Sequence, residues 1–414
     1  MNDAAPRTHD LVIVGGGLVG ASLALALEPL GLDVALVDAA PAGEMPAVFD
    51  ERSLSFAEAT VNALDALGVM PRLRAAGGPI RRIVVSRAGD FGQARLEAER
   101  YGRTAFGQVV VARDFGHALE AQLDTVRSLT RYRPARLVAT SFDGDARRVT
   151  LQTPGGMVEL AAKLVVGADG TMSALRTALD IGSDATDYGH TLFVARLRTE
   201  RAPDGTAYER LTDDGPTALL PRADRHFGLV HGVADDEADV VEAMDEAAFL
   251  ARLQSRLGWR HGRLLACGTR SRYAGRRVIA QATVAPRAVL VGNAAQTIHP
   301  LGAQGFNLGL RDALTLAEEV GAALRDGRDA IGNDAMLHRY AERRVEDRER
   351  TLAFSDRLLR LGTARGLLMR PLRSAALLAL DHPSWLQAWL VCGAMGYRGD
   401  VPALCRGDDG RRRA

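Results

Sequence analysis

A glycine-rich turn near the start of the chain, Gly15-Gly16-Gly17-Leu18-Val19-Gly20, constrains the fold more than any other feature. It follows residues 11–14, a β-branched apolar run typical of a buried strand, and it precedes residues 18–30, where Leu and Ala recur at helical spacing. Residues 34–37 form a second apolar run. The chain therefore begins with a β-α-β unit, which requires a parallel sheet.

The glycines that match the pattern Gly-x-Gly-x-x-Gly have separate physical roles. Gly15 permits the tight turn, Gly17 lets a pyrophosphate approach the backbone, and Gly20 allows close helix packing. The helix that follows offers N–H groups and a partial positive charge to an anion. Asp38 ends the second strand, where it can accept hydrogen bonds from a ribose. The arrangement predicts a dinucleotide site, although this motif alone does not separate NAD from FAD.

Two further glycine-containing segments follow predicted strands. One is Gly167-Ala168-Asp169-Gly170-Thr171-Met172-Ser173-Ala174-Leu175-Arg176, after the apolar run 164–166. The other is Gly292-Asn293-Ala294-Ala295, after the run 288–291, and it leads into the loop His299-Pro300-Leu301-Gly302-Ala303-Gln304-Gly305-Phe306-Asn307. These two segments separate FAD from NAD.

Between the predicted strands the sequence changes character. Short segments at 191–198, 206–211, 217–220 and 227–232 are interrupted by turn residues, which predicts an antiparallel sheet inserted into the first domain. Beyond Gly305, residues 307–324 and 335–361 have helical spacing. A chain of 414 residues is long enough for two or three domains.

Composition excludes several classes of function. Lys plus Arg total 52 and Asp plus Glu total 51, so no excess of one charge is present to hold nucleic acid. Cys267, Cys392 and Cys405 lie far apart without a Cys-x-x-Cys pair, which predicts neither a metal site nor a disulfide framework. The N-terminus lacks signal-peptide features, and no apolar run reaches 18 residues. We therefore expect a multi-domain enzyme of the bacterial cytoplasm.

The three glycine segments, taken in order, resemble the FAD-dependent aromatic monooxygenases of the para-hydroxybenzoate hydroxylase type over most of the chain. Further motifs resemble the ubiquinone-biosynthesis branch, the UbiH-type 2-polyprenyl-6-methoxyphenol hydroxylases. These motifs are Phe49-Asp50-Glu51-Arg52, Gly107-Gln108-Val109-Val110, Tyr208-Glu209-Arg210, Gly215-Pro216, Leu219-Leu220-Pro221, Gly258-Trp259-Arg260 and Val291-Gly292-Asn293-Ala294-Ala295-Gln296-Thr297. The resemblance implies FAD as cofactor and NADH or NADPH as co-substrate.

The resemblance also implies an architecture. We expect an α/β FAD-binding domain, Rossmann-like and of the para-hydroxybenzoate hydroxylase type, with an inserted antiparallel-sheet α+β substrate domain and a helical C-terminus. The expected FAD-binding domain comprises residues 1–80, 100–182 and 280–330, and the substrate domain comprises 81–99 and 183–279. Residues 331–414 form the expected helical C-terminal region.

Cofactor-binding residues follow from the same resemblance. Asp169 is expected to reach toward the FAD pyrophosphate and the nicotinamide cofactor, and Arg176 is expected to support its loop. N–H groups at the start of the helix after Gly302 should face the pyrimidine edge of the flavin and stabilise negative charge there. The expected set is Gly15, Gly17, Gly20, Asp38, Arg52, Gln108, Asp169, Gly170, Gly292, Asn293, Gly302, Ala303, Gln304, Gly305 and Asn307.

The chain departs from the family pattern at three positions. Asn293 stands where the family usually has an Asp that accepts from a ribityl hydroxyl; the amide keeps a carbonyl acceptor, and the UbiH branch has the same departure. Gln296 stands where many relatives have His, and Ala303 where many have Gly. No second glycine-rich fingerprint and no redox cysteine pair occur, which disfavours a disulfide reductase.

The implied reaction is hydroxylation of a polyprenylated phenol. In it, NAD(P)H reduces FAD, O2 adds to give C4a-hydroperoxyflavin, and one oxygen passes to an electron-rich ring carbon, while the protein supplies orientation and a dry site. Residues 302–312 resemble the family's flavin loop, and His299 and Pro300, which lie beside it, are candidate catalytic residues. Leu219, Leu220 and Pro221 are candidate lining of the substrate site.

Other interpretations stay open. The substrate position could be another ring carbon or a soluble aromatic compound; the enzyme could instead reduce prenyl double bonds, or the chain could be an FAD-bearing subunit of a ubiquinone-biosynthesis complex. Near the C-terminus, apolar patches alternate with Arg360, Arg365, Arg370 and Arg373. That pattern suits helices packed on the body of the protein or peripheral contact with an anionic inner membrane.

Overall fold

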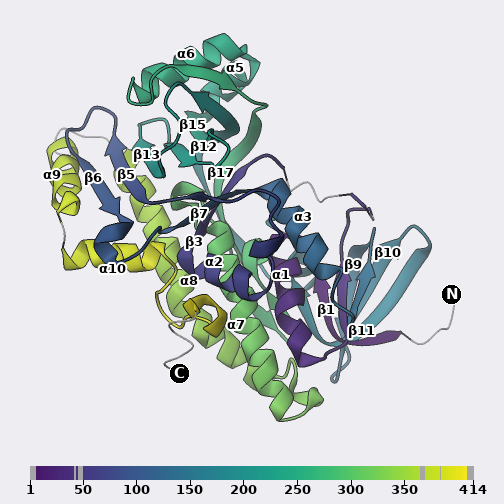
Figure 1. Ribbon diagram of the computed structural model, residues 1–414. Coiled ribbons are helices and arrows are strands. Elements are labelled where there is room, and N and C mark those ends of the chain that lie inside the picture. The colour runs from purple at the N-terminus through teal and green to yellow at the C-terminus, as the bar shows by residue number, and fades with distance from the viewer. Residues whose placement is uncertain (1–5, 42, 45–49, 364–368, 383, 408–414) are drawn as a thin grey trace.

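The computed structural model describes residues 6–41, 43–44, 50–363, 369–382 and 384–407, so Phe49 and Arg365 lie outside the described ranges. Within those ranges the chain forms an eight-stranded, a nine-stranded and a three-stranded sheet, with helices on their faces (Figure 1).

The eight-stranded sheet is built on the N-terminal β-α-β unit. Its parallel strands have the order β19-β11-β1-β2-β8, and β18 pairs antiparallel with β19. These strands are β1 (Arg7–Val14), β2 (Val34–Val37), β8 (Leu129–Tyr132), β11 (Gly156–Gly167), β18 (Val284–Ala285) and β19 (Ala288–Leu290). An antiparallel meander of β9 (Arg136–Phe142) and β10 (Arg147–Thr153) extends from β11. The predicted parallel strands are confirmed.

Successive side chains of β1 cover opposite faces of this sheet. Leu11 and Ile13 are fully buried in a core shared with the helices on one face. Val12 and Val14 pack on the other face with the meander and with Leu175. The helices are α1 (Leu18–Leu27), α3 (Ala112–Leu123) and α7 (Gly305–Arg325) on the first face, and α4 (Ala174–Ala178) on the second. A strand buried on both faces explains the uninterrupted apolar run in the sequence.

The nine-stranded sheet is the inserted sheet predicted from the sequence. Its main path is β20-β17-β12-β15-β14-β13-β5-β6, with β16 beside β12. The strands are β5 (Arg82–Arg87), β6 (Gln93–Glu97), β12 (Ser183–Thr199), β13 (Thr206–Leu211), β14 (Thr217–Pro221), β15 (Phe227–Ala234), β16 (Leu264–Cys267), β17 (Ser271–Ala280) and β20 (Gln296–Thr297). The sheet is not wholly antiparallel, because β5 arrives from an earlier segment and runs parallel to β13.

The two faces of the nine-stranded sheet have different neighbours. The outer face packs against α5 (Ala238–Ala243) and α6 (Glu246–Leu257) through a core that includes Phe249. The inner face turns toward the three-stranded sheet of β3 (Ser53–Ala57), β4 (Gly78–Pro79) and β7 (Gly107–Val111). The approach is close: a Cβ atom on Gly228 would lie 2.2 Å from Ser53 Oγ. Only glycine fits there.

Two helices that the predicted domain scheme assigns to different regions share one buried core. α8 (Asp334–Thr363) packs along α7, and it does so across the expected boundary at residue 331. Arg344 donates to Asp312 at 2.8 Å, and Arg311 donates to Asp347 at 2.6 Å. These four side chains are almost fully buried. Removing one partner of such a pair would cost about 3–5 kcal/mol, because it would leave a buried charge without a partner.

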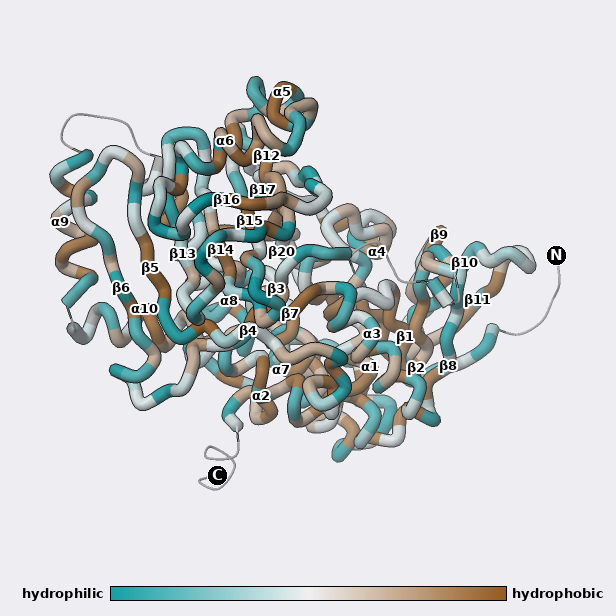
Figure 2. The backbone as a smooth tube through the Cα atoms, turned by 45° about the horizontal axis from the view of Figure 1, so that its top comes forward, coloured by the Kyte–Doolittle hydropathy of each residue, from teal (hydrophilic) through white to brown (hydrophobic). Residues whose placement is uncertain are grey.

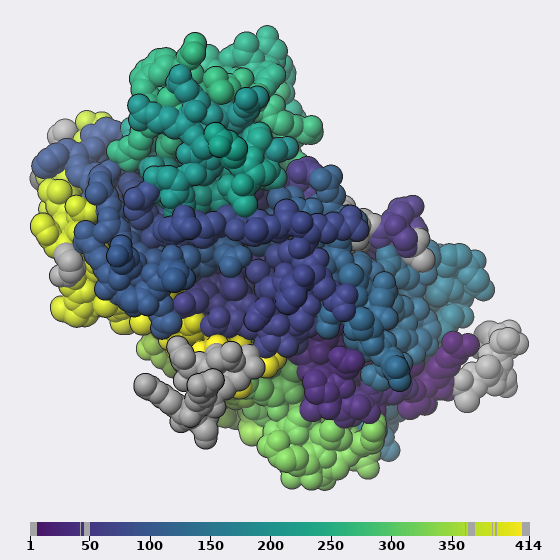
Figure 3. Space-filling model, in the orientation of Figure 1, coloured from purple at the N-terminus to yellow at the C-terminus, as the bar shows by residue number. Residues whose placement is uncertain are grey.

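The C-terminal helices α9 (Met369–Asp381) and α10 (Trp385–Ala394) pack beside the β5–β6 hairpin, at the end of the molecule away from β9 and β10 (Figures 1 and 3). Arg373 pairs with Asp90 at 2.7 Å, and Tyr101 donates to buried Gln387 at 2.6 Å. Packing on the body of the protein is therefore confirmed for the inner face of these helices. Along α9 the chain alternates between hydrophobic and hydrophilic segments (Figure 2). None of the described helices is long and apolar enough to cross a bilayer.

Candidate active site

The three glycine segments meet at the carboxyl ends of β1, β11 and β19. Gly15 has a φ of +109°, and a Cβ atom on it would lie 2.4 Å from the backbone oxygen of Ala168. A Cβ atom on Gly20 would lie 1.9 Å from the oxygen of Gly15. The first turn is therefore closed on both sides by backbone, and side chains are excluded from it.

The start of α1 is open for an anion. Gly17 is the N-cap residue and supplies no side-chain acceptor to the first turn, whose N–H groups stay available for a ligand. Asp38 lies directly beside this turn, since a Cβ atom on Gly16 would be 2.2 Å from its Oδ2. Burial raises the pKa of Asp38, while the hydrogen bond from the Ala40 N–H lowers it. This arrangement suits a pyrophosphate on the helix and a ribose on the carboxylate.

The second segment is ordered by its own side chains. Asp169 accepts from Ser173 Oγ at 2.5 Å and from the Leu175 N–H at 3.0 Å, so both carboxylate oxygens hold the turn that starts α4. Arg176 is buried and donates to the backbone oxygens of Thr171 at 2.8 Å and Ala294 at 2.9 Å. Arg176 supports the loop, as expected, and also ties the second segment to the third.

The third segment packs against the first. Cβ atoms on Gly292 and Gly309 would lie 3.0 and 2.9 Å from Val19 Cγ2, which brings this segment to the first turn of α1. The Gly292 N–H donates to Asp312 Oδ2 at 3.1 Å, and Gln296 Nε2 donates to the same oxygen at 2.6 Å. Gln296, the position where many relatives have His, thus connects the third segment to Asp312 of α7. Asn293 is exposed between buried neighbours, where its side chain is free to meet a cofactor.

The loop that enters α7 has a left-handed backbone at two successive residues, with φ of +75° at Gly302 and +50° at Ala303. Gln304 is the N-cap of α7 but makes no side-chain cap; its Nε2 donates to the Gly302 oxygen at 3.1 Å instead. Gly305 begins the helix. The N-terminus of α7 is therefore open like that of α1, and its partial positive charge can stabilise an anion.

Asn307 fastens this loop to β3. Its Nδ2 donates to the backbone oxygens of Ser55 at 3.0 Å and Ala303 at 2.9 Å, and its Oδ1 accepts from the Ala57 N–H at 2.9 Å. The side chain is 1% exposed and its hydrogen-bonding capacity is largely used within the protein. Its side chain thus positions the flavin loop.

Three residues of the predicted FAD set remain, namely Arg52, Gln108 and Gly170. Arg52 forms a bidentate pair with Asp50, at 2.7 and 2.8 Å, and lies over the ring of Tyr273 on β17. Hydrogen bonding to Asp50 raises the pKa of Arg52 against the effect of burial. Gln108 is on β7, paired with Phe56 of β3. Gly170, the last of the set, has a φ of +83° and stands in the second segment.

His299 forms a buried contact that the sequence did not predict. Its Nε2 lies 2.6 Å from His190 Nε2 on β12, and its Nδ1 accepts from the Leu301 N–H at 3.1 Å. Burial lowers the pKa of His299 to about 3 and also lowers the pKa of His190, so both rings are neutral. His299 must then carry its proton on Nε2 and donate to His190. Both ring nitrogens of His299 are therefore used in hydrogen bonds within the protein. Pro300 is exposed.

The predicted substrate lining divides between the two faces of the sheet. Leu219 is fully buried in the outer core with Phe249 of α6, so it does not face the FAD-binding domain. Leu220 packs on the inner side with Val109 of β7. Pro221 follows on the outer side, with its backbone oxygen against Gly78. Of the three, only Leu220 points toward the candidate flavin site, because side chains alternate along a strand.

Several important residues had no assigned role at the sequence level. The contacts of His190 and Asp312 form only when distant segments of the chain are brought together. A charged residue in the middle of the strand motif Tyr208-Glu209-Arg210 is a signal that could have been read, because central strands rarely carry an unpaired charge.

The site fits FAD. Two uncapped helix N-termini, a carboxylate beside the first turn and an exposed amide at Asn293 supply the donors and acceptors that a dinucleotide with a ribityl chain needs. When bound, the flavin supplies the redox and oxygen chemistry, and the residues described here hold and orient it.

Comparisons with known proteins agree. Residues 8–355 match the family model described as FAD binding domain. The chain is 35% identical to "Ubiquinone hydroxylase UbiL" of Rhodospirillum rubrum, over 86% of this chain and 82% of that protein. It is 30% identical to the "3-demethoxyubiquinol 3-hydroxylase" of Escherichia coli, over 82% and 86% of the two chains.

A solved structure confirms the fold class. The p-nitrophenol 4-monooxygenase PnpA from Pseudomonas putida superposes with a TM-score of 0.78, over 95% of this chain and 99% of that one, at 17% identity. The predicted cofactor, FAD, is confirmed by the family match. The chain therefore belongs to the FAD binding domain family, among the FAD-dependent monooxygenases that include the ubiquinone hydroxylases.

Proposed function

We propose that this enzyme hydroxylates the ring of a polyprenylated phenol in ubiquinone biosynthesis, with NAD(P)H and O2 as co-substrates. The observation that carries the proposal is the meeting of the flavin loop with the inner face of the nine-stranded sheet. Leu301, directly before the flavin loop, packs with Leu211 of β13. Val109 of β7 packs with Ala207 of the same strand. A ring held on this face would lie against the flavin loop.

The proposal draws its substrate class from the relatives named ubiquinone hydroxylases, which align over more than four-fifths of this chain. The mostly apolar inner face agrees with it, since burying a phenol and the first units of a prenyl tail is favourable at roughly 25 cal/mol per Å² of apolar surface. Orientation, exclusion of water and charge stabilisation by the N-terminus of α7 are the contributions of the protein.

Mass spectrometry of quinone lipids from a strain lacking the gene tests the proposal. We expect one polyprenyl phenol to accumulate, and its missing oxygen identifies the ring carbon that is hydroxylated. Restoration by the wild-type gene but not by a variant without FAD is the control. Unaltered quinones, in a strain without a redundant hydroxylase, would contradict the ubiquinone assignment and favour a soluble aromatic substrate.

The purified protein answers two further questions. Rates of flavin reduction with NADH and with NADPH identify the co-substrate. Hydroxylation by the isolated chain would exclude a purely scaffolding subunit, and oxygen consumption that depends on a phenol would exclude a reductase of prenyl double bonds.

We also propose that the β5–β6 hairpin and α9 contact an anionic membrane surface. Phe91 at the hairpin turn is 73% exposed and Leu372 on α9 is 63% exposed. A groove of about 380 Å³ between the hairpin turn and α9 is lined by Phe91, Pro371, Ala375 and Leu378 among others. Exposed apolar side chains of this kind suit insertion at a lipid interface.

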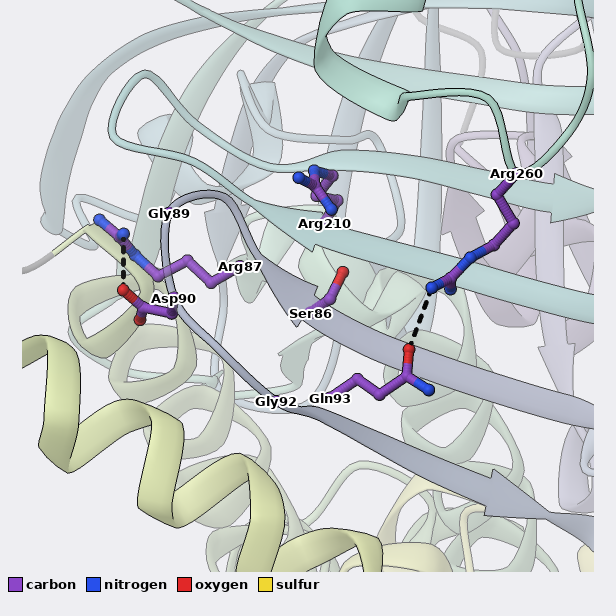
Figure 4. Close-up of a pocket in the computed structure, with 8 residues that line it drawn as sticks. All are labelled: Ser86, Arg87, Gly89, Asp90, Gly92, Gln93, Arg210 and Arg260. Carbon is purple, nitrogen blue, oxygen red and sulfur yellow. Dashed lines mark hydrogen bonds and ion pairs between the residues drawn. The ribbon is translucent and has the colours of Figure 1, made fainter.

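A cationic recess of about 270 Å³ adjoins this groove, sharing Gly89 and Asp90 with it. Figure 4 shows Arg210 between the hairpin and Arg260, whose side chain reaches Gln93. Among the described residues, neither Arg210 nor Arg260 forms an ion pair with a carboxylate. Burial and the neighbouring Arg260 lower the pKa of Arg210. These features favour an anionic lipid headgroup.

Cosedimentation with vesicles tests this contact. Phosphatidylglycerol vesicles should bind the wild-type protein, phosphatidylcholine vesicles should bind it less, and Phe91→Ser with Leu372→Ser should weaken binding severalfold. Val240→Ser, an exposed apolar position on α5, is the matched control. Equal binding of all variants would rule out this surface.

A further inference from the structure

Glu209 lies on the inner face of the nine-stranded sheet. It is on β13, whose ladder with β5 runs without a break from Thr206 to Leu211. Two residues before Glu209, Ala207 packs with Val109 of β7. Two residues after it, Leu211 packs with Leu301, directly before the flavin loop. Because side chains at i and i+2 share a face, Glu209 points into the space between β7 and the flavin loop.

The carboxyl group has no partner in the described part of the chain. Its Oε1 is buried without a hydrogen bond. Across the strands its neighbours are Ala218 of β14 and Val85 of β5, both apolar. The residue as a whole keeps partial exposure, as expected for a side chain that lines an internal space rather than a filled core.

An arrangement of this kind needs a reason. A buried polar group without a hydrogen bond costs free energy, and a lone buried carboxylate costs more. Burial alone raises the pKa of Glu209 to about 8, with no charged neighbour contributing. At neutral pH the group is therefore largely a carboxylic acid, which carries one O–H donor and one carbonyl acceptor. Each such group in a native protein calls for an explanation, and a bound ligand that completes its hydrogen bonds is one.

We propose that Glu209 is the polar anchor for the oxygen substituents of the aromatic substrate. A phenol hydroxyl donates to its carbonyl oxygen, while its O–H donates to an oxygen on the adjacent ring carbon. The cross-strand neighbours of Glu209 on this face, Val85 and Ala218, are apolar, so this pair of hydrogen bonds sets which ring edge faces the flavin. The inference rests on the proposed function and names the residue that would orient the ring.

The orienting role differs from proton removal. A protonated acid in an apolar setting is a poor base, and the ring needs a fixed position more than it needs a charged neighbour. Loss of the anchor should therefore leave flavin reduction intact and let activated oxygen be lost without hydroxylation. Such uncoupling separates a positioning residue from one that holds FAD.

Three variants test the inference in the FAD-loaded protein. Glu209→Gln keeps a donor and an acceptor, Glu209→Leu removes both, and Glu242→Gln is the matched control, an exposed glutamate on α5 of the outer face. The probe is a 2-methoxyphenol carrying one prenyl unit. Measurements are FAD content, the change in the flavin spectrum on phenol binding, and the fraction of oxidised NAD(P)H that yields product.

We expect all variants to retain FAD. Glu209→Leu should weaken phenol binding about tenfold or more and lower the coupled fraction severalfold, and Glu209→Gln should recover part of both. Thermal unfolding gives an independent readout: Glu209→Leu should be as stable as the wild type or more stable, because it removes an unsatisfied carboxyl. A large loss of stability would instead assign Glu209 a structural role and overturn the inference.

The outcomes separate this inference from the proposed function. If the wild type binds and hydroxylates the probe and Glu209→Leu does so equally well, the anchor is refuted and the function stands. If the wild type neither binds nor hydroxylates the probe or its longer-chain homologues, the proposed function is refuted, and the inference about Glu209, which rests on it, is refuted with it.

Discussion

Of two asparagines at the candidate cofactor site, one is buried and one is exposed. Replacing the first is predicted to change the stability of the fold, and replacing the second is predicted to change FAD binding. Asn307 makes two hydrogen bonds to β3 and one to Ala303, whereas Asn293 is exposed. Asn307→Ala should lower the free energy of unfolding of the apoprotein by roughly 2–4 kcal/mol, since it leaves buried backbone groups unsatisfied. Asn293→Ala should leave that value unchanged and weaken FAD binding. Denaturant unfolding and FAD titration measure both; equal destabilisation would contradict the distinction.

The pKa of Glu209 also predicts how stability depends on pH. The folded pKa, about 8, lies above the ordinary glutamate value of about 4.5, so the unfolded chain releases this proton first. The stability contribution of the protonated group is full below about pH 4.5 and is lost as the pH rises through 8. Relative to wild type, Glu209→Gln should therefore gain stability between those pH values, by a few kcal/mol at most. A pH-independent difference in unfolding free energy would refute the elevated pKa.

At the scale of elements, the turn from β1 into α1 depends on backbone contact that a single methyl group would prevent. A Cβ atom at position 20 would lie 1.9 Å from the Gly15 oxygen, so Gly20→Ala must displace the helix or the turn. We expect FAD content to fall severalfold, measured by flavin absorbance per protein. Gly155→Ala is the control, because its nearest contact is 3.8 Å away. Full FAD content in Gly20→Ala would disprove the packing argument.

Elements also explain what the departures from the family pattern do. Gln296 donates to Asp312, and Asp312 in turn holds Gly292 and Arg344. The amide thus connects the third glycine segment to α7 and α8 without adding a charge. Ala303 keeps the left-handed conformation that glycine would adopt more easily. Both departures are accommodated by local geometry, and the open N-terminus of α7 is preserved.

For the whole molecule, the histidine pair joins β12 of the nine-stranded sheet to the segment that precedes α7, and it predicts sensitivity to acid. Both pKa values are lowered in the folded protein, so stability is full above about pH 6.5 and is lost as the pH falls toward 3. His190→Gln keeps a neutral acceptor for His299 and removes one titrating group. It should reduce the slope of unfolding free energy against pH by up to ~1 kcal/mol per pH unit below 6.5. His338→Gln, at an exposed position, is the control, and an unchanged slope in His190→Gln would contradict this account.

The sequence by itself determined the elements and the cofactor. Apolar runs and helical spacing are local, so the strands at 34–37 and 206–211 were predicted to the residue and α7 and α8 to within two residues at each end, whereas β1 begins four residues before the predicted 11–14. The first glycine segment predicted a dinucleotide site because so tight a turn requires glycine, and the resemblance of all three segments to a known family indicated FAD.

Only the tertiary structure decided which side chains face one another. Alternation along β14 predicts that Leu219 and Leu220 point apart, but which of them faces the flavin depends on where α6 packs. His190 and His299 are 109 residues apart in sequence, and their contact exists because β12 passes beside the flavin loop. Glu209 is likewise an ordinary strand residue until β7 and the loop enclose it. The burial of a side chain and its contacts across the sheets depend on how the sheets and helices pack together, and no local sequence pattern specifies that packing.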